Sequence, residues 1–221
     1  MSPQLCSRTS PVHALADRRA MVDLQLRARG IGDERVLAAM ERVPRELFVL
    51  DELRARAYDD AALPIGAEQT ISQPYMVACI CSELQLHGGE KVLDVGTGSG
   101  YQAAVLAELA GEVHSVERIP ELADRARSAL AAAGYADRVH VHDGDGALGL
   151  PAEAPFGGIA VAAAARRPPP ALLEQLGPHA RLVIPIGPRD QQFLRVYVQT
   201  PEGAADFAAV PCRFVPLVTD G

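Results

Sequence analysis

A glycine-rich stretch follows an apolar run in the segment VLDVGTGSGYQ at residues 92–102. Gly96, Gly98 and Gly100 alternate with small hydroxyl residues, and a helical pattern begins directly after them. Glycine permits positive φ and lets a ligand approach the backbone, and the first turn of a helix attracts negative charge. The order of strand, tight loop and helix therefore indicates a small-molecule site, although a purely structural turn would give the same pattern.

The spacing of the glycines indicates which ligand the loop would bind. The dinucleotide fingerprint is GxGxxG, whereas this loop reads GxGxG and follows an acid, Asp94. This arrangement suits a ligand without a pyrophosphate, S-adenosylmethionine, whose methionyl carboxylate and amine can bind to backbone groups and to the acid. The residues expected to contact it here are Asp94, Gly96, Thr97, Gly98, Ser99 and Gly100.

Two further acids stand where later apolar runs end. Glu117 lies 21 residues after Gly96, and a carboxylate at this place can accept from both hydroxyls of a ribose. Asp145 lies in the stretch DGDG, where it can accept from an adenine amine while Gly146 lets the base lie close. We expect Glu117, Asp145 and Gly146 to contact the cofactor, although a solvated loop or a simple turn would also contain such residues.

No set of residues in the sequence predicts a metal site. The stretch DGDG would need further acids to form a calcium loop, and Ala147 and Leu148 do not supply them. His140 and His142 are two residues apart on one expected strand and therefore share a face. Because no third ligand is predicted beside them, we expect these histidines to pack rather than to hold a metal.

The elements that must position these residues change in character near residue 87. Before it, apolar residues recur at helical spacing in 17–28, 33–43 and 74–86, and residues 58–74 show no period and are expected to form an ordered loop. After it, short apolar runs alternate with helical patterns, which is typical of a parallel sheet with crossover helices. The expected strands are 91–95, 112–117, 138–142, 157–162, 180–186, 193–200 and 208–218, the last two compatible with antiparallel pairing, and the expected helices between them are 101–110, 120–133 and 170–176.

This order predicts the fold class and the domain organisation. We expect an α/β fold with a doubly wound, mostly parallel, seven-stranded sheet of the Rossmann-like kind and an N-terminal helical extension. Residues 1–16 are expected to be a flexible tail, 17–86 to hold the N-terminal helices and a polar loop, and 87–221 to form the cofactor-binding α/β part. All of these parts are expected to form one compact unit.

Composition excludes several classes of protein. The chain has 221 residues and a net charge of −7, without the concentrated basic face of a nucleic-acid-binding protein. No stretch is apolar for long enough to span a membrane, and the N-terminus lacks the apolar region of a signal peptide. The four cysteines have no metal or disulfide spacing, so we expect a reduced, cytoplasmic protein in which Cys79 and Cys81 are packing residues.

Longer segments of the chain resemble a known family. ERVPRELFV, YDDAALPIGAEQTISQPYMVA and VLDVGTGSGYQAAVLAEL are similar to the protein-L-isoaspartate (D-aspartate) O-methyltransferase family, as are LLEQLGPHARLVIPIG and RFVPLV farther on. The resemblance covers nearly the whole chain, from about residue 18 to residue 218, and TISQPYMVA is its most specific part. It implies methyl transfer from S-adenosyl-L-methionine to the α-carboxylate of L-isoaspartyl and D-aspartyl residues, leaving S-adenosyl-L-homocysteine and an ester that closes to a succinimide.

The resemblance also assigns roles to residues. It makes Ser72 the active-site serine, which would orient the acceptor carboxylate, although Ser72 could instead cap the helix that begins near Pro74. It implies isoaspartyl proteins and peptides as partners, and we expect a monomer that needs no metal. The residues that it places at the acceptor are Leu63, Pro64, Ile65, Thr70, Ile71, Gln73, Val215 and Pro216, with Leu217 beside the last two.

The sequence departs from the family pattern at three positions and leaves other functions open. Gly157 stands where the family usually has Asp, Ala147 where bacterial members often have Trp, and Ala162 where Thr or Gly is common. The alternatives are a carboxyl methyltransferase for a dedicated peptide, a reader of isoaspartyl peptides without turnover, and a nicotinamide oxidoreductase, which the glycine spacing disfavours. A carboxylate acceptor is already ionised at neutral pH, so no general base is expected.

Overall fold

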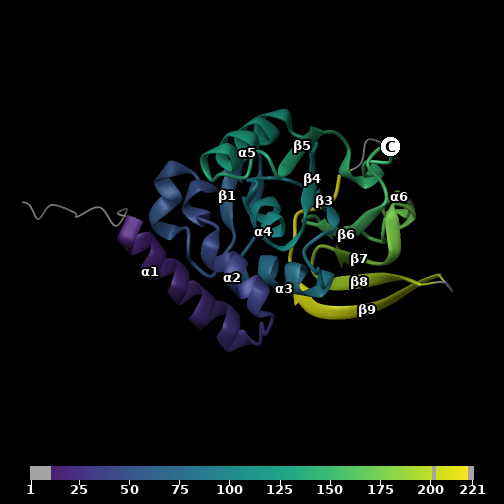
Figure 1. Cartoon of the computed structure of the whole chain (residues 1–221), viewed down its shortest axis with the longest axis horizontal. Helices are drawn as coiled ribbons and strands as arrows, with labels where there is room; N and C mark the ends of the chain where they lie inside the picture. The colour runs from purple at the N-terminus through teal and green to yellow at the C-terminus, as the bar shows by residue number, and fades with distance from the viewer. Residues whose placement is uncertain (1–10, 201–202, 219–221) are drawn as a thin grey trace, which may run out of the picture.

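The computed structural model describes residues 11–200 and 203–218 of the chain. Its centre is a seven-stranded sheet with the order β5-β4-β3-β6-β7-β8-β9 (Figure 1). The five strands from β5 to β7 are parallel, and β8 and β9 are antiparallel to their neighbours, which confirms the predicted sheet. The strands are β3 (Lys91–Val95), β4 (Glu112–Glu117), β5 (Val139–Asp143), β6 (Phe156–Val161), β7 (Leu176–Ile186), β8 (Gln192–Thr200) and β9 (Gly203–Cys212).

Helices cover both faces of this sheet. Val92 faces a core shared with α3, α4 and α5, whereas its neighbour Leu93 faces a second core that includes Leu172 of α6. This alternation follows from the two-residue period of a strand, and it leaves β3 apolar on both faces. The helices are α3 (Pro74–Leu84), α4 (Tyr101–Leu109), α5 (Pro120–Ala132) and α6 (Pro170–Glu174), with the short 3-10 turn η5 (Gly146–Leu148) after β5.

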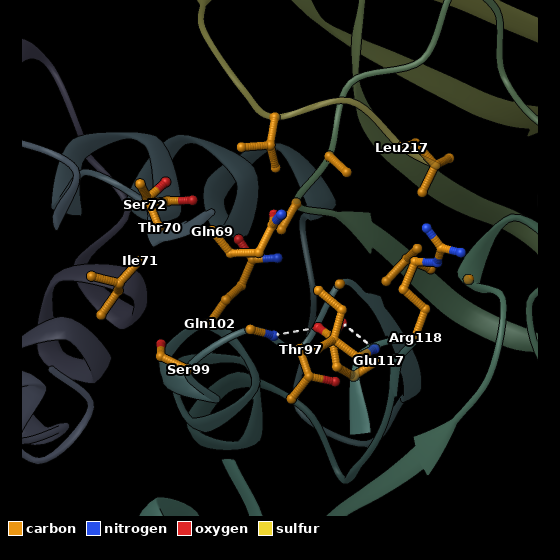
Figure 2. Close-up of a pocket in the computed structure, with 18 of the residues that line it drawn as sticks. Gln69, Thr70, Ile71, Ser72, Thr97, Ser99, Gln102, Glu117, Arg118 and Leu217 are labelled. Atoms are coloured by element: carbon orange, nitrogen blue, oxygen red, sulfur yellow. Dashed lines mark hydrogen bonds between the residues drawn. The ribbon is translucent and has the colours of Figure 1, made fainter. Parts of the chain in front are cut away.

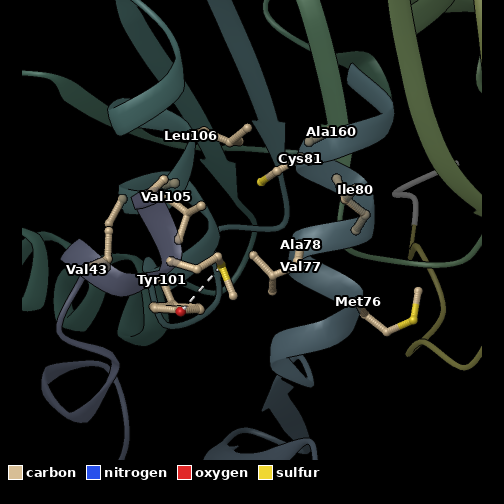
Figure 3. Close-up of a cluster of buried hydrophobic side chains, with 14 of the residues drawn as sticks. Val43, Met76, Val77, Ala78, Ile80, Cys81, Tyr101, Val105, Leu106 and Ala160 are labelled. Atoms are coloured by element: carbon tan, nitrogen blue, oxygen red, sulfur yellow. Dashed lines mark hydrogen bonds between the residues drawn. The ribbon is translucent and has the colours of Figure 1, made fainter. Parts of the chain in front are cut away.

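Packing between α3 and α4 forms the part of the core that lies under the predicted site. Figure 3 shows Val77 and Cys81 of α3 beside Tyr101 and Val105 of α4, and all four side chains are buried. Cys79 and Cys81 are free thiols buried in α3, as expected for packing residues, whereas Cys6 lies outside the described residues. Burial raises the pKa of the Cys81 thiol, which keeps it protonated and unreactive.

The helical extension starts earlier than its sequence pattern suggests. Helix α1 (Pro11–Met21) continues through η1 (Val22–Leu26) and η2 (Arg27–Arg29) until Gly30, whose φ of 92° ends it. The prediction of a tail over 1–16 is therefore wrong for residues 11–16, and the rest of that range lies outside the described residues. Residues 11–16, PVHALA, are too few to show a helical period of their own, so this start was missed.

The second helix follows its predicted cap. Asp33 accepts hydrogen bonds from the backbone nitrogens of Arg35 and Val36 at 2.9 and 3.3 Å, so it caps α2 (Glu34–Arg42) as expected. Helix α2 then packs on α3 and α4, as Figure 1 shows at the side of the sheet where the chain begins. Two 3-10 turns, η3 (Arg45–Leu47) and η4 (Asp51–Arg56), lead from α2 to the polar loop.

The polar loop contains a hairpin that the sequence analysis missed. Strands β1 (Leu63–Gly66) and β2 (Gln69–Ile71) pair antiparallel around Ala67 and Glu68, whose φ values are 49° and 57°. Three or four residues are too few to show a period. The two left-handed turn residues are neither Gly nor Asn, and the only usual turn residue beside them is Gly66, whose φ is 91°, so the turn signal was weak.

Two boundaries near the end of the chain also differ from the prediction. Strand β7 begins at Leu176 and shortens α6, because the carbonyl of Gln175 accepts from the nitrogen of Phe156 at 2.9 Å. Strand β9 ends at Cys212, so residues 213–218 are not the strand that was expected. They lie instead against the segment that follows β6, where the nitrogen of Ala164 donates to the carbonyl of Val215 at 2.7 Å. Among the described residues, no helix combines the length and the apolar character that crossing a membrane requires.

Candidate functional site

The glycine loop between β3 and α4 needs its three glycines. Gly96, Gly98 and Gly100 have φ values of 90°, 53° and 89°, a region that other residues rarely adopt. The loop lies where β4 and β6 flank β3, which is the point at which the order of the parallel strands reverses. Open α/β sheets bind ligands at this point, because adjacent loops leave the sheet on opposite faces and open a crevice.

A pocket opens above this loop at the carboxyl ends of the strands (Figure 2). It is lined by the glycine loop, by the ends of β3 and β4, by residues 69–72 (β2 and Ser72), which we call the acceptor loop, and by the segment after Phe214. Figure 2 shows Thr70 and Ser72 at one side of the pocket and Glu117 with Arg118 at the other. The predicted residues that line it are Thr70, Ile71, Ser72, Gly96, Thr97, Gly98, Ser99, Glu117, Gly146, Val215, Pro216 and Leu217. Gly100 is not in the lining and lies against α5 instead, where an added Cβ would be 3.2 Å from Leu130 Cγ.

Glu117 connects the glycine loop to the end of β4. Its carboxylate accepts from the nitrogens of Gly98 and Ile119 at 2.8 and 3.0 Å, and the residue is only 6% exposed. Each carboxylate oxygen accepts one of these two hydrogen bonds, and a carboxylate oxygen can accept two. Both oxygens therefore keep the capacity to accept from a vicinal diol such as a ribose.

Asp94 lies beneath the pocket rather than in its lining. It is fully buried and accepts from Gln102 Nε2 and from Ser115 Oγ, both at 2.8 Å. Ser115 Oγ lies 2.5 Å from the hydroxyl of Thr97, so the acid reaches the loop through a chain of hydrogen bonds. Burial raises the pKa of Asp94 to about 6, against the two hydrogen bonds, which favour its charged form.

The acid after β5 is likewise next to the pocket, not in its lining. Asp145 caps η5 by accepting from the nitrogen of Ala147 at 2.9 Å, and Gly146 contributes the lining surface. A Cβ on Gly146 would lie 2.5 Å from Val95 Cγ1, so only glycine fits between η5 and β3 without a shift. The approach of an adenine base to this glycine stays a prediction.

Ser72 stands at the boundary between two pockets. A second pocket adjoins the first, and the two share Thr70, Ser72, Ala162 and Val215 in their linings. The cap position of α3 is Gln73, and it makes no side-chain capping bond, so capping by Ser72 is excluded as its role. The Gln73 amide donates instead to Asp60 Oδ1 at 2.7 Å and fixes the start of the helix.

A buried arginine holds the acceptor loop from below. Arg45 is fully buried, and its Nε and Nη2 donate to the carbonyls of Ala57 and Ser72, both at 2.8 Å. Its guanidinium carbon lies 4.7 Å from the centre of the Tyr101 ring, at the start of α4. Burial lowers its pKa to about 10, so it remains charged at neutral pH. One cation therefore joins the acceptor loop to the helix that follows the glycine loop.

Three residues expected at the acceptor lie elsewhere. Leu63 and Ile65 are buried in β1, and Pro64 between them is exposed on the opposite side of the strand. None of the three lines either pocket, and Ile65 instead packs toward the glycine loop, where its Cδ1 lies 3.4 Å from a Cβ built on Gly98. Side chains alternate between the two sides of a strand, so β1, which the sequence did not reveal, directs Leu63 and Ile65 into the core.

The departures from the family pattern are at different distances from the pocket. Gly157 lies near the amino end of β6, where an added Cβ would meet Glu90 at 2.8 Å, so it does not adjoin the cofactor loops. Ala147 is buried beside Gly146, and Ala162 lines both pockets. Ala162 is thus the departure with direct access to the site.

The histidines form a cluster on β4 and β5. His142 Nε2 lies 3.1 Å from His114 Nδ1, and His140 is the cross-strand neighbour of His114. Burial lowers the pKa of His114, which favours its neutral form. Within residues 11–200 and 203–218, no group of three or more ligands is arranged to hold a metal ion.

Comparisons with known proteins agree with this geometry. The family model of protein-L-isoaspartate(D-aspartate) O-methyltransferase matches residues 16–221. The chain belongs to this family. Protein-L-isoaspartate O-methyltransferases of Methanoculleus marisnigri and Marinobacter nauticus are 52% and 55% identical to it, with coverage of 91% of this chain and 91% and 92% of those proteins.

A solved structure shows the same fold. It is described as a putative protein-L-isoaspartate O-methyltransferase from Plasmodium falciparum in complex with S-adenosyl-L-homocysteine. The TM-score is 0.79 at 23% identity, and the match covers 91% of this chain and 98% of that chain. The predicted α/β fold of S-adenosylmethionine-dependent methyltransferases is thereby confirmed.

Some residues of the site were not assigned from the sequence. Gln102 lines the pocket and donates a hydrogen bond to Asp94. The only feature of the sequence that could have indicated it is its position in the first turn after the glycine loop. Arg118 directly follows Glu117 and lines the same pocket. Arg45 lies in the segment ERVPRELFV, where nothing in its spacing distinguishes it from the surface arginines around it.

Asp94 is expected to make the stability of the protein depend on pH. Its pKa is raised to about 6 in the folded state, from an ordinary value of 3.8, so folding favours the protonated form. The stabilisation present at low pH is lost as pH rises through this interval. We expect the free energy of unfolding of the wild type, relative to Asp94→Asn, to fall by about 2 kcal/mol from pH 4.5 to pH 7. Urea unfolding at both pH values measures it, and a constant difference would contradict the buried, raised pKa.

Arg45 is expected to affect the acceptor loop more than the cofactor loop. In Arg45→Met the carbonyls of Ala57 and Ser72 lose their donor, and each lost buried bond costs about 1–3 kcal/mol. We expect turnover to fall at least about tenfold, with a smaller loss of cofactor affinity and with partial recovery in Arg45→Lys. Steady-state kinetics and calorimetry on folded protein measure both. Arg54→Met, at an exposed position on η4, is the control, and an equal effect in that variant would refute the role of Arg45.

Proposed function

We propose that this chain transfers the methyl group of S-adenosyl-L-methionine to the α-carboxylate of L-isoaspartyl, and of D-aspartyl, residues in damaged proteins and peptides. The observation that carries the proposal is the position of Ser72, which lines both the pocket above the glycine loop and the adjoining pocket. A methyl group can pass between two sites only where they meet. The relatives at 52% and 55% identity bear the name of this activity.

The pocket residues fit the cofactor. Glu117 supplies a carboxylate with free acceptor capacity for the ribose hydroxyls. Gln102 Oε1 is a buried acceptor with no partner in the described part of the chain, and its residue lines the pocket, so it suits the methionyl amine. Gly146 lines the pocket without a side chain, so a flat base could approach its backbone there.

The reaction needs alignment more than proton transfer. When bound, the cofactor supplies a methyl group on a sulfonium, and the acceptor carboxylate is ionised at neutral pH without a base. The residues that line the two pockets in the described part of the chain include no histidine, in agreement with this requirement. Ser72 would donate to the acceptor carboxylate and direct one oxygen toward the methyl carbon, since a hydroxyl orients the anion without neutralising it.

Exclusion of water supports the same step. The segment that includes Val215 and Pro216 crosses the pocket and is fastened to Ala164 on both sides, because Ala164 N donates to Val215 and Leu217 N donates to Ala164, both at 2.7 Å. An anion and a cation neutralise each other in this reaction, so a dry site stabilises the transition state relative to the separated charges. The products are a methyl ester, which closes to a succinimide, and S-adenosyl-L-homocysteine. A monomer acting in the cytoplasm stays the prediction from the sequence.

Two synthetic peptides test the function directly. They are identical except that one contains isoaspartate and the other aspartate, and both are incubated with labelled S-adenosyl-L-methionine. We expect base-labile label on the isoaspartyl peptide alone. Label on neither peptide, with the cofactor still bound, would refute the proposal and favour a dedicated peptide acceptor or a reader without turnover.

Ser72→Ala is expected to lower turnover of the isoaspartyl peptide by about tenfold to a thousandfold, because a positioned hydrogen bond is lost at the reacting carboxylate. Cofactor affinity should change by less than about threefold, since the cofactor loops keep their bonds. Ser128→Ala, at an exposed position on α5, is the matched control. Turnover equal to that of the wild type would remove Ser72 from the mechanism.

Glu117→Ala is expected to weaken cofactor binding by about 1.5–3 kcal/mol, because charge-assisted hydrogen bonds to the ribose are lost and the nitrogen of Gly98 loses its acceptor. Glu121→Ala removes an equal charge from an exposed position of α5 and serves as the control. Isothermal titration calorimetry measures both variants. An affinity that is unchanged in Glu117→Ala would count against the ribose contact.

A further inference from the structure

The second pocket has a chemical character that the family alone does not specify. It adjoins the cofactor pocket at Thr70, Ser72, Ala162 and Val215, and we call it the acceptor groove. Its other wall residues come from η2, from the start of α3 with the preceding Gln73, from Ala62 before β1, and from the end of β9 with the segment that follows it. The distinctive ones are Arg29, Tyr75, Met76, Arg213 and Phe214.

The charged side chains in the wall of the acceptor groove are both cationic. They are Arg29 and Arg213, and no acidic residue belongs to the wall within the described residues. The chain as a whole carries a net charge of −7, so two arginines and no acid in one groove differ from the average surface. The two lie far apart in the sequence and are brought together at the groove only by the fold.

Arg29 is held in place by two neighbours. Its guanidinium carbon lies 3.6 Å from the centre of the Tyr75 ring, and its Nη1 lies 3.1 Å from Asp60 Oδ2. The other oxygen of Asp60 accepts from Gln73, the residue next to Ser72. The position of this cation is therefore coupled to the residue beside the proposed catalytic serine.

The guanidinium of Arg29 retains donors for a ligand. An arginine has five N–H groups, and the hydrogen bonds found for Arg29 in the described part of the chain use Nη1 alone. Its side chain is 41% exposed, so an arriving carboxylate can reach it without displacing Asp60. Arginine recognises carboxylates through paired N–H groups, which suits an Asp or Glu side chain.

We propose that the acceptor groove selects isoaspartyl peptides that carry acidic side chains next to the damaged residue. The proposal rests on the proposed function. Arg29 and Arg213 line only the groove and not the cofactor pocket, so they would bind the flanking residues and leave the reacting carboxylate to Ser72. A cation on the reacting carboxylate would lower its nucleophilicity, whereas a cation on a neighbouring residue adds binding energy without this penalty.

Three isoaspartyl peptides test the proposal. They are identical except that the two residues on each side of the isoaspartate are Glu, Gln or Lys. We expect kcat/KM to decrease in the order Glu, Gln, Lys, with about a three- to tenfold difference between the first and the last, as partly exposed ion pairs provide. The difference should become smaller at 0.5 M salt, because the pairs are screened.

The double variant Arg29→Gln/Arg213→Gln assigns the preference to the groove. We expect its ratio of kcat/KM for the Glu and Lys peptides to approach one, and a ratio measured within one variant is not altered by a general loss of activity. Arg54→Gln/Arg56→Gln makes the same change of charge on η4, outside the groove wall, and should keep the wild-type ratio.

Two results would overturn the proposal. One is a wild type that treats the three peptides alike or prefers the Lys peptide, and the other is a double variant that keeps the wild-type ratio. Methylation of none of the three peptides, with the cofactor bound, would overturn the proposed function itself and the preference with it.

Discussion

The position of the acceptor loop depends on a single buried guanidinium. Removing Arg45 from water is unfavourable, as its lowered pKa of about 10 shows, and its neighbours compensate part of this cost, because Nε and Nη2 have acceptors whereas the buried Nη1 has none among the described residues. These neighbours are two main-chain carbonyls and the face of an aromatic ring, contributed by three separate segments. If any of them moved away, a buried charge would lose a partner. The loop that carries Ser72 is therefore fixed relative to α4, and with it to the glycine loop that precedes α4.

The two acids near the cofactor loops serve different purposes although both are buried. Glu117 accepts one backbone hydrogen bond on each oxygen, which leaves acceptor capacity at the pocket. Asp94 accepts from side chains and has no opening to the pocket, so its role is to orient Gln102 and, through Ser115, Thr97. One acid lines the pocket itself, and the other orients two neutral side chains of the pocket lining, Gln102 and Thr97.

Much of this arrangement could be predicted from the sequence, and the features that could not be predicted were missed for identifiable physical reasons. The parallel strands and the glycine loop were predictable because burial on both faces and positive φ restrict the residues allowed there. The burial of Leu63 and Ile65 was not predictable, because the strands of their hairpin are too short to show an alternating pattern. Asp94 was expected to contact the ligand, whereas it is buried beneath the pocket lining. A sequence shows that an acid precedes a loop but not which way its side chain points. Arg45 resembles a surface arginine until its burial is known.

The two sites also differ in which parts of the chain build them. The cofactor pocket is formed mainly by loops that leave adjacent parallel strands, so its geometry follows from the sheet itself. The two charged residues in the wall of the acceptor groove come from η2 and from the segment after β9, outside the loops that follow the parallel strands. At physiological ionic strength charges act over about 8 Å, so the net charge of −7 has little influence inside the groove compared with two arginines in its wall. The proposed acceptor preference would therefore be set locally, by two residues outside the lining of the cofactor pocket.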